Sequence, residues 1–398
     1  MRLRKILGSA AALALSTIVL LSAACGGAAP TASTPPASSP SKAQSSSPAA
    51  QPSSPAAQAS SSPSAAQAWQ QEYTEWEKKT YEAAKKEGKV VGYGFWSPEN
   101  EKIRRDYFSK KYPGIELETL TTTTAAEKLR TEKETRNYVA DFYIGGGTTP
   151  YTLNQFGLTE PFMPPLEKEP GAKWVVGPSA STTYPQLTYA VTGKGIMINT
   201  NLVPPAREPK AWKDLLDPFW ANGKITLDNP ARGGGPGPSW ASWADSRSDI
   251  LGRPFLQGLA AQKPVLFKGS VTPALKSLVR GEYYAVMTAF PQDLKDVAGG
   301  PAKFLYLEPE TQGTTLLLAL IKNAPHPNAA KLFLNMHLSK EFQEIVANEQ
   351  LAGPVRLGIQ PRNPLVNNEG RKIYIDQEKD FAATTEWSNT VGKELFGP

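Results

Sequence analysis

The chain has 398 residues, with 43 Lys or Arg against 37 Asp or Glu, two His and one Cys. This length suits two domains whose cores need no disulfides, and the scarce His and Cys leave little for a metal cage or a histidine-based triad. The formal net charge of +6 hints at nucleic acid.

The first residues predict a secretory signal peptide over 1–24. Arg2, Arg4 and Lys5 precede the apolar run Ile6–Leu21, which small residues separate from Cys25. A run of about 16 residues is short for a membrane-spanning helix, which needs about 20. Loss of this segment removes three basic residues and no acid, so half of the charge excess disappears and nucleic acid is no longer a favoured partner.

The only cysteine lies at the predicted cleavage point. The segment Leu21-Ser22-Ala23-Ala24-Cys25 resembles a bacterial lipobox, which implies lipid attachment at Cys25 and a membrane anchor. Residues 25–67 are then rich in Ala, Ser and Pro, and Lys42 is their single charge. Such a composition has no apolar period to bury and predicts a disordered tether between the lipid and a folded body on the extracytoplasmic side.

The ordered part begins with an alternation of helices and strands. Trp69, Tyr73 and Trp76 share one face of a helix that ends at Gly88, and residues 89–95 read as a buried strand. Ser97-Pro98 starts a second helix, because serine caps helix N-termini and proline suits the first turn. Strands at 115–120 and 140–144 flank a further helix at about 125–138. This alternation predicts an α/β fold with a mostly parallel sheet.

A second set of elements follows. Strands are expected at 190–199, 224–227, 284–287 and 316–321, and helices are expected at 328–336 and 340–349. The region from Pro361 onward is weakly patterned. Neither a P-loop nor a nucleophile elbow occurs in the sequence. His326 and His337 suit structural or solvent-facing roles, so the sequence offers no persuasive catalytic set.

Glycine-rich or hydroxyl-rich loops follow several of the predicted strands. In open α/β sheets, ligands bind beyond the carboxyl ends of the strands, where free N–H groups favour anions. Arg232 adds a planar fork suited to carboxylate or phosphate. The predicted ligand-binding residues are Trp96, Ser97, Gly146, Gly147, Thr148, Arg232, Gly233, Gly234, Ser270, Thr288 and Phe290.

Several segments resemble one known family in their order and spacing. They are Tyr112-Pro113-Gly114-Ile115, Ala140-Asp141-Phe142, Met197-Ile198-Asn199-Thr200-Asn201, Gly281-Glu282-Tyr283-Tyr284-Ala285-Val286 and Ala324-Pro325-His326-Pro327-Asn328. Together they look like the extracellular solute-binding proteins of ABC importers, in the branch that includes ferric-iron and aminoethylphosphonate binders. The resemblance covers about residues 80–360.

The resemblance implies the two-lobed fold of type II periplasmic binding proteins, with ligand in a cleft that closes about a hinge. The expected first lobe is 68–194 plus about 313–398, with the C-terminal tail either there or returned to the second lobe at 195–312. A small polar or anionic solute and the permease are the implied partners. We expect a monomer without cofactor or enzymatic activity.

Three alternatives remain open at this point: a ferric-iron binder, a secreted α/β hydrolase, and an adhesive or structural lipoprotein, which the predicted tether favours and the glycine-rich loops disfavour. Ferric members of the family use adjacent tyrosines, which draws attention to Tyr283 and Tyr284. However, this pair falls at a strand entrance, earlier than the family's position, and alternation would send the two side chains to opposite faces. An organic anion or other polar solute is therefore preferred over iron. The second alternative, a secreted α/β hydrolase, lacks a nucleophile and base.

Overall fold

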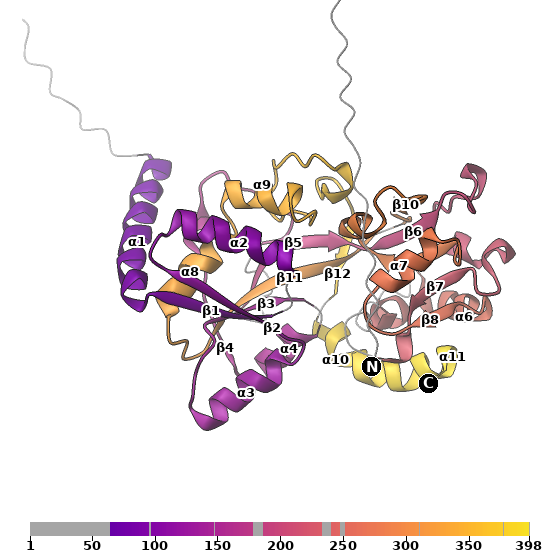
Figure 1. Ribbon diagram of the computed structural model, residues 1–398, viewed down its shortest axis with the longest axis horizontal. Helices are drawn as coiled ribbons and strands as arrows, with labels where there is room; N and C mark the ends of the chain where they lie inside the picture. The colour runs from indigo at the N-terminus through magenta and orange to yellow at the C-terminus, as the bar shows by residue number, and fades with distance from the viewer. Residues whose placement is uncertain are drawn as a thin grey trace, which may run out of the picture. The chain divides into compact units, whose positions relative to one another are not determined.

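The computed structural model describes residues 64–94, 97–146, 148–177, 186–232, 240–246, 251–309, 311–376 and 378–397 (Figure 1). The predicted signal peptide, the lipidation site Cys25 and nearly all of the predicted tether lie outside these residues. Within the described part of the chain, no helix is both long and apolar enough to cross a membrane.

The first helix, α1 (Ala65–Glu87), begins and ends as its sequence predicts. Ser64 and Gln67 form a reciprocal capping box at the start, and Gly88 ends the helix in the left-handed conformation with φ 74°. The aromatic stripe of Trp69, Tyr73 and Trp76 packs against the first hydrophobic core. Figure 1 shows that α1 lies beside α8 (Pro327–Met336), a helix far away in the sequence.

The first sheet has the strand order β12-β11-β3-β1-β2 in the described residues, with β4 and β5 also paired to β11. Strands β1, β2 and β3 are mutually parallel, whereas β11 runs antiparallel to β3 and β5. The strand bounds are β1 Lys89–Gly94, β2 Glu116–Thr121, β3 Phe142–Gly145, β4 Thr159–Glu160, β5 Leu187–Gly193, β11 Thr311–Ile321 and β12 Ile373–Ile375. The helices of this part are α2 Pro98–Lys111, α3 Ala125–Thr135, α4 Thr149–Gln155, α8 and α9 Lys340–Asn348.

The second sheet has the described order β10-β6-β9-β7-β8, in which β7 is parallel to both β8 and β9. Its strands are β6 Gly195–Asn199, β7 Ile225–Asp228, β8 Val265–Phe267, β9 Ala285–Ala289 and β10 Ala302–Leu305. Helices α6 (Gly252–Ala261) and α7 (Thr272–Val279) belong to this part. Two α/β sheets of mixed strand direction agree with the predicted fold class.

Ahead of its C-terminal segment, the chain passes between the two sheets at two places. The expected single strand at 190–199 is wrong, because β5 belongs to the first sheet and β6 to the second, with Lys194 between them. Two glycines flank Lys194, and a Cβ at Gly193 or Gly195 would clash with neighbouring strands, which marks a tightly packed crossing. The chain returns between β10 and β11.

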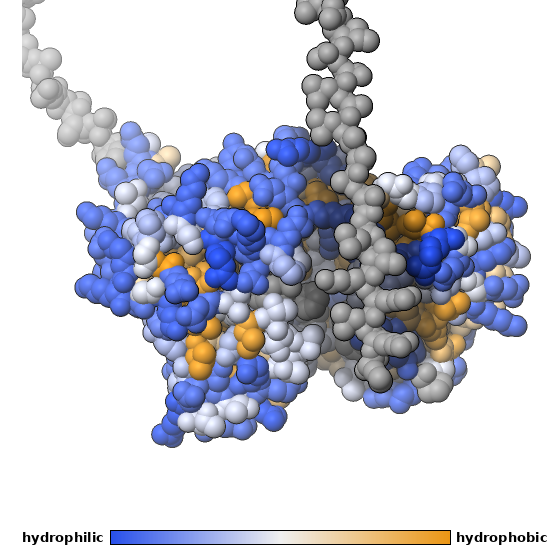
Figure 2. Space-filling model, viewed as in Figure 1, coloured by the Kyte–Doolittle hydropathy of each residue, from blue (hydrophilic) through white to orange (hydrophobic). Residues whose placement is uncertain are grey.

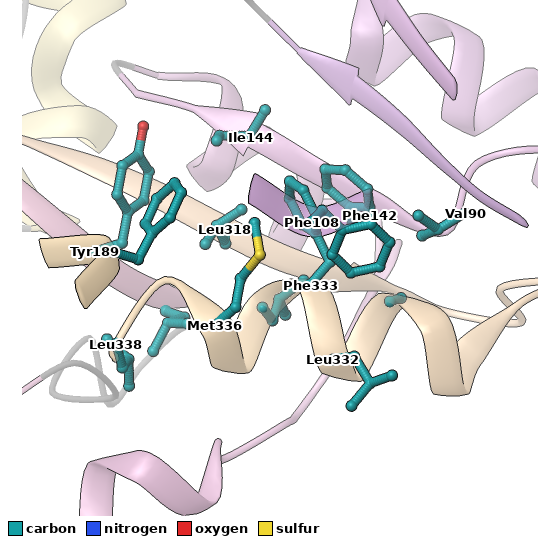
Figure 3. Packing of buried hydrophobic residues seen from close by; sticks show 14 of the residues in the cluster. Val90, Phe108, Phe142, Ile144, Tyr189, Leu318, Leu332, Phe333, Met336 and Leu338 are labelled. Carbon is teal, nitrogen blue, oxygen red and sulfur yellow. The ribbon is translucent and has the colours of Figure 1, made fainter. Parts of the chain in front are cut away.

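Each sheet has hydrophobic cores of its own. In the first, the ring of Phe333 from α8 lies 4.2 Å from that of Phe142 and 5.5 Å from that of Phe108, all fully buried (Figure 3). The second core is rich in tryptophan, with Trp212 and Trp240 both within about 5 Å of Trp243, ring to ring (4.7 and 5.1 Å). Apolar burial of this kind supplies most of the folding free energy.

The C-terminal segment, which the sequence left loosely placed, joins both parts. After β12 pairs with the first sheet, α10 (Glu378–Trp387), the π-helical turn η9 (Ser388–Gly392) and α11 (Lys393–Phe396) follow. Trp387, Val391 and Phe396 are buried in the core of the second sheet. The tail therefore crosses between the sheets a third time.

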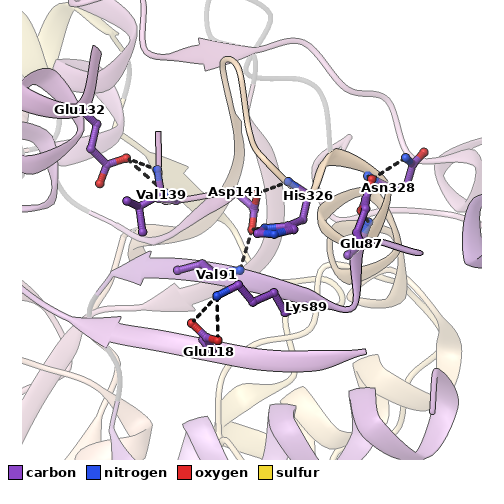
Figure 4. Close-up of polar contacts among 11 residues, drawn as sticks. Glu87, Lys89, Val91, Glu118, Glu132, Val139, Asp141, His326 and Asn328 are labelled. Atoms are coloured by element: carbon purple, nitrogen blue, oxygen red, sulfur yellow. Dashed lines mark hydrogen bonds and ion pairs between the residues drawn. The ribbon is translucent and has the colours of Figure 1, made fainter. Parts of the chain in front are cut away.

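Both histidines have structural surroundings. Asp141 is fully buried, and its carboxylate accepts the N–H groups of Val91 (2.7 Å) and His326 (2.6 Å), with the His326 ring 2.9 Å away (Figure 4). Burial raises the pKa of Asp141, and these hydrogen bonds oppose that shift. The His337 ring is fully buried among aromatic rings, which lowers its pKa.

The surface is mostly polar where Figure 2 shows described residues, with apolar side chains in small separate patches. The large apolar side chains that remain exposed among the described residues are Leu120, Val139, Phe156, Met163 and Val265. Scattered exposed apolar residues are ordinary on the surface of a folded domain.

Candidate functional site

A cavity of about 500 Å³ lies between the two sheets, within the size range of small-molecule sites. It opens at the carboxyl ends of β2 and β3 from one sheet and of β7, β8 and β9 from the other, as expected for open α/β sheets. Its described lining consists of Thr122, Thr123, Ala125, Tyr143, Gly146, Thr149, Thr192, Lys194, Asp228, Arg232, Phe267, Gly269, Val271, Thr288, Phe290, Gln292, Thr314 and Leu316.

The wall from the first sheet is neutral and rich in hydroxyl groups. Thr122 and Thr123 follow β2, and Thr149 begins α4. Burial raises the pKa of Tyr143 to about 12, with the Thr149 hydroxyl opposing the shift, so this phenol is a neutral donor at physiological pH. Gly146 allows a close approach of strands, because a Cβ there would lie 2.8 Å from the Thr315 carbonyl oxygen.

The crossing between the sheets supplies the floor of the cavity. Thr192 on β5 and Thr314 on β11 are direct partners in the antiparallel ladder. Lys194 follows Thr192 by two residues, is 4% exposed and lies 3.9 Å from Asp376, from Nζ to Oδ2. Burial lowers the pKa of Lys194, and the charge of Asp376 opposes that shift.

The wall from the second sheet contains an ion pair. Asp228 ends β7 and Arg232 ends the 3-10 turn η5 (Pro230–Arg232), which brings Nε and Nη2 of the guanidinium within 3.2 and 2.6 Å of the carboxylate. Burial raises the pKa of Asp228, while the hydrogen bonds from Arg232 oppose the shift. The arginine predicted to bind the ligand thus already holds an acid in a two-point contact.

Thr288 has an unusual backbone conformation in this wall. Its φ is 59°, a left-handed value that β-branched residues rarely adopt, and its hydroxyl donates to the Met287 carbonyl oxygen at 2.6 Å. Strained residues of this kind concentrate at binding sites. Phe267 and Phe290 complete the wall with apolar surface.

The predicted site residues divide into three groups. Gly146, Arg232, Thr288 and Phe290 line the cavity. Trp96, Gly147, Gly233 and Gly234 lie outside the described residues. The other three, Ser97, Thr148 and Ser270, do not line it.

For Ser97 and Ser270, the physical reason is local hydrogen bonding of the hydroxyl, whereas the Thr148 side chain makes no capping hydrogen bond. The Ser97 hydroxyl accepts the Asn100 N–H at 3.2 Å, and the Ser270 hydroxyl accepts the Thr272 N–H at 3.2 Å. Thr148 lies at the start of α4, where its carbonyl oxygen accepts from Thr152. Hydroxyl residues between a strand and a helix serve as helix caps at least as readily as ligand donors.

The tyrosine pair of the ferric alternative is not among the described residues that line the cavity. Tyr283 and Tyr284 precede β9 and pack against different hydrophobic clusters, Tyr284 beside Phe219 at a ring distance of 5.3 Å. The described residues contain no group of three or more His, Cys, Asp and Glu side chains placed to hold a metal ion.

Lys194, Tyr143, Asp228 and Gln292 line the cavity without having been predicted. Lys194 had a recognisable signal, since a lone charge between Gly193 and Gly195 interrupts an otherwise buried apolar stretch. Tyr143, Asp228 and Gln292 have no such signal in the sequence, because they become neighbours only when the two sheets face one another.

The chain belongs to a family of bacterial extracellular solute-binding proteins, whose model matches residues 154–374. This family is defined by solute binding, a transport function rather than catalysis. No curated protein matches the sequence.

Solved structures show the same fold at low sequence identity. The apo ferric ion-binding protein A of Pasteurella haemolytica is similar with a TM-score of 0.63 and 15% identity, over 77% of this chain and 98% of that one. The periplasmic binding protein AfuA of Actinobacillus pleuropneumoniae, with exogenous fructose-6-phosphate bound, gives 0.62 and 19% over 78% and 98%. The Trichodesmium protein IdiA (FutA), in complex with iron and citrate ligands, gives 0.60 and 18% over 77% and 98%. The predicted type II fold of periplasmic binding proteins is thereby confirmed.

Proposed function

We propose that this protein is the lipid-anchored binding component of an ABC importer. It captures a small polar or anionic solute in the cavity between its sheets, closes over it about the crossing segments and delivers it to the permease. The observation that carries the proposal is the cavity itself, which both sheets line with polar side chains at their strand ends. Membership of the solute-binding family supports the same function.

The lining favours an anionic solute. Among the described lining residues, Lys194 and Arg232 are basic and Asp228 is acidic, so basic groups outnumber acidic ones. Asp376 lies 3.9 Å from Lys194 but is not itself a described lining residue. Several threonine hydroxyls and the Tyr143 phenol add neutral donors, while Phe267 and Phe290 offer apolar surface. A compact solute that combines a carbon skeleton with an acidic group matches this set.

The ferric alternative is less well supported by these residues. Structural neighbours include a ferric ion-binding protein and a protein holding iron with citrate, but also one with fructose-6-phosphate bound. Tyr143 is the one tyrosine among the described lining residues, and the adjacent pair Tyr283 and Tyr284 lies outside the cavity. A hydrolase is not favoured either, because the family is defined by binding.

The membrane anchor depends on Cys25, which the sequence places directly after the predicted signal peptide. We expect mass spectrometry of the membrane fraction to find a lipid-modified Cys25 at the mature N-terminus. Recovery of a free Cys25 thiol from that fraction would contradict the anchor without affecting the solute-binding proposal.

A thermal-shift screen of organic acids, sugar phosphates, amines, sugars and iron complexes tests the function. A solute in large excess over its Kd should add several kcal/mol of apparent stability. Small-angle scattering with that solute should show a decrease in the radius of gyration as the cleft closes. Stabilisation by no solute class, together with an unchanged scattering curve, would refute the proposal.

Calorimetry with the solute found in the screen tests the predicted role of Arg232. Arg232→Ala should lose about 2 kcal/mol of binding free energy, because a charged partner of the ligand is removed and Asp228 is left unpaired. Arg253→Ala is the matched control, since Arg253 pairs with Asp245 and does not line the cavity. Equal affinity in both variants would remove Arg232 from the site.

A further inference from the structure

Three residues at the floor of the cavity differ from the rest of the lining. Thr192 and Thr314 face one another across β5 and β11, and Lys194 follows on the same chain segment as Thr192. All three line the cavity, and Thr192 and Lys194 are buried, at 2% and 4% exposure. The floor therefore combines a cation with two hydroxyl groups in a site shielded from bulk water.

The two hydroxyl groups lack hydrogen-bond partners. The Oγ1 atoms of Thr192 and Thr314 are closed to water and make no hydrogen bond within the described structure. Buried polar atoms are nearly always paired, and an unpaired one costs about 1–3 kcal/mol. Two such atoms on directly paired residues, both lining one cavity, indicate that a group from outside the chain satisfies them, with each hydroxyl reaching it by rotation about χ1.

The cation beside these hydroxyls determines which group fits. Hydroxyl groups donate to oxygen acceptors, and a buried ammonium attracts negative charge. Asp376, whose Oδ2 lies 3.9 Å from Nζ of Lys194, supplies one such charge but is not among the described lining residues of the cavity. Arg232 likewise has an acid beside it, since it makes a two-point contact with Asp228 on the wall of the second sheet. Lys194 also lies on the segment that joins β5 of one sheet to β6 of the other, so a group bound there contacts the crossing directly.

We propose that Lys194, Thr192 and Thr314 form an oxyanion subsite that receives the carboxylate or phosphate group of the solute. The subsite rests on the proposed function, because it supplies one end of the solute cavity. Lys194 provides the charge, and the two threonines provide hydroxyl donors to separate oxygens of the same group. Arg232 contributes a second positive charge from the wall of the second sheet.

Small probes test the subsite without knowledge of the whole solute. The full chain is titrated with inorganic phosphate and with acetate, and with acetamide as the neutral counterpart of acetate, at constant ionic strength set by sodium chloride. Carbon-13 labelling of the lysines lets NMR follow the Cε resonance of Lys194. We expect acetate or phosphate to shift this resonance saturably and acetamide to leave it unchanged. The two anion arms show which oxyanion the subsite prefers.

Substitutions then assign the binding to these side chains by thermal shift. Lys194→Met keeps the length of the side chain and should weaken anion binding at least about tenfold. Thr192→Val and Thr314→Val keep the shape of threonine and should each weaken it about threefold to tenfold. Lys89→Met is the control, because Lys89 pairs with Glu118 away from the cavity. If Lys194→Met does not fold, the valine variants and the NMR titration of the unsubstituted chain still show whether an anion binds at these side chains.

The outcomes separate the subsite from the function. Absence of a saturable Lys194 shift with both anions, or equal affinity in the valine variants and the Lys89→Met control, overturns the subsite. If a neutral solute nevertheless stabilises the protein and closes it in scattering, the solute-binding function stands and only the subsite fails. If neither anions nor any solute class is bound and the scattering curve stays fixed, both proposals fail.

Discussion

The two walls of the cavity are built in different ways. The wall of the first sheet draws on residues far apart in the chain, from Thr122 to Thr314, and offers hydroxyl groups. The wall of the second sheet comes from the shorter stretch between Asp228 and Gln292 and contains an ion pair. One wall is thus equipped with donors for a ligand, whereas the charges of the other largely satisfy each other.

This difference teaches that a charged residue in a cavity is not automatically a ligand partner. Arg232 was the most visible candidate in the sequence, yet the structure places Asp228 against it. Lys194 was less visible and also has an acid nearby, Asp376, but it shares the cavity floor with Thr192 and Thr314, whose hydroxyls make no hydrogen bond in the described structure. The contacts a residue already makes determine what it can offer to a solute.

The largest expected effect concerns the two cores behind these walls. Phe333→Ala should reduce the free energy of unfolding by about 3–5 kcal/mol, because it removes a fully buried ring that packs on Phe108 and Phe142. Trp240→Ala should reduce it by a similar amount through the core of the second sheet. Chemical denaturation measures both. Phe156→Ala, at a ring that is 40% exposed, should cost less than about 1 kcal/mol. A loss from Phe333→Ala as small as that control would contradict the packing.

The next largest effect is expected from breaking the ion pair in the wall of the second sheet. Asp228→Asn should reduce the free energy of unfolding by about 1–2 kcal/mol, because Arg232 loses a charged acceptor that is itself largely buried. The loss stays modest, since the Arg232 side chain is 36% exposed and water screens it. Asp245→Asn, in an exposed pair with Arg253, is the control and should have almost no effect. Equal denaturation midpoints for the two variants would show that the Asp228–Arg232 pair adds no stability.

The third prediction concerns the pH dependence of stability that arises from Asp293, which follows the lining residue Gln292 in the chain. Burial raises the pKa of Asp293 from 3.8 to about 7, and the charge of Asp296 adds to this shift while the N–H of Phe290 opposes it. Between these two pH values the folded protein binds more protons than the unfolded chain. This carboxyl therefore lowers the free energy of unfolding as pH rises from about 4 to 7, by at most about 1.4 kcal/mol per pH unit.

The variant Asp293→Asn isolates this contribution. We expect the difference in stability between the unsubstituted protein and the variant to change across pH 4–7 and to level off on either side. Urea denaturation at a series of pH values measures the difference. A constant difference over the whole series would mean that Asp293 titrates near its ordinary value in the folded protein.

The smallest effect concerns a contact between the two parts of the fold. Lys295 of the 3-10 helix η7 (Pro291–Val297) lies 3.2 Å from Glu99 of α2 and donates to the Glu349 carbonyl oxygen at 2.9 Å. Lys295→Met should change the free energy of unfolding by less than about 1 kcal/mol, because the pair is exposed. It should, however, move small-angle scattering toward a more open form.

Lys303→Met provides the control for that scattering experiment. Lys303 pairs with Glu208, and its strand β10 belongs entirely to the second sheet, so the variant should leave the scattering curve unchanged. Identical curves for the two variants would show that the Lys295 contact has no part in holding the sheets together.

Much of the fold could be predicted from local signals. The caps Ser97 and Gly88 give the bounds of two helices, and the alternation of elements predicts the α/β class. The division of the expected strand 190–199 into β5 and β6, and the short strands β8, β10 and β12, could not be predicted, because sheet membership depends on pairing between distant segments. The candidate site was predicted in part, because ligands in α/β folds bind at the ends of strands. The contacts of Asp228 with Arg232 and of Thr314 with Thr192 arise only in three dimensions.

The position of β11 has a consequence for the order in which the protein forms. This strand lies between β3 and β5 in the first sheet, yet it comes after every strand of the second sheet in the chain. During synthesis, the strands of the second sheet can all pair before β11 leaves the ribosome, whereas the first sheet must wait for it. The sheet that begins first is therefore the sheet that is completed last, with its strand edges unpaired in the meantime.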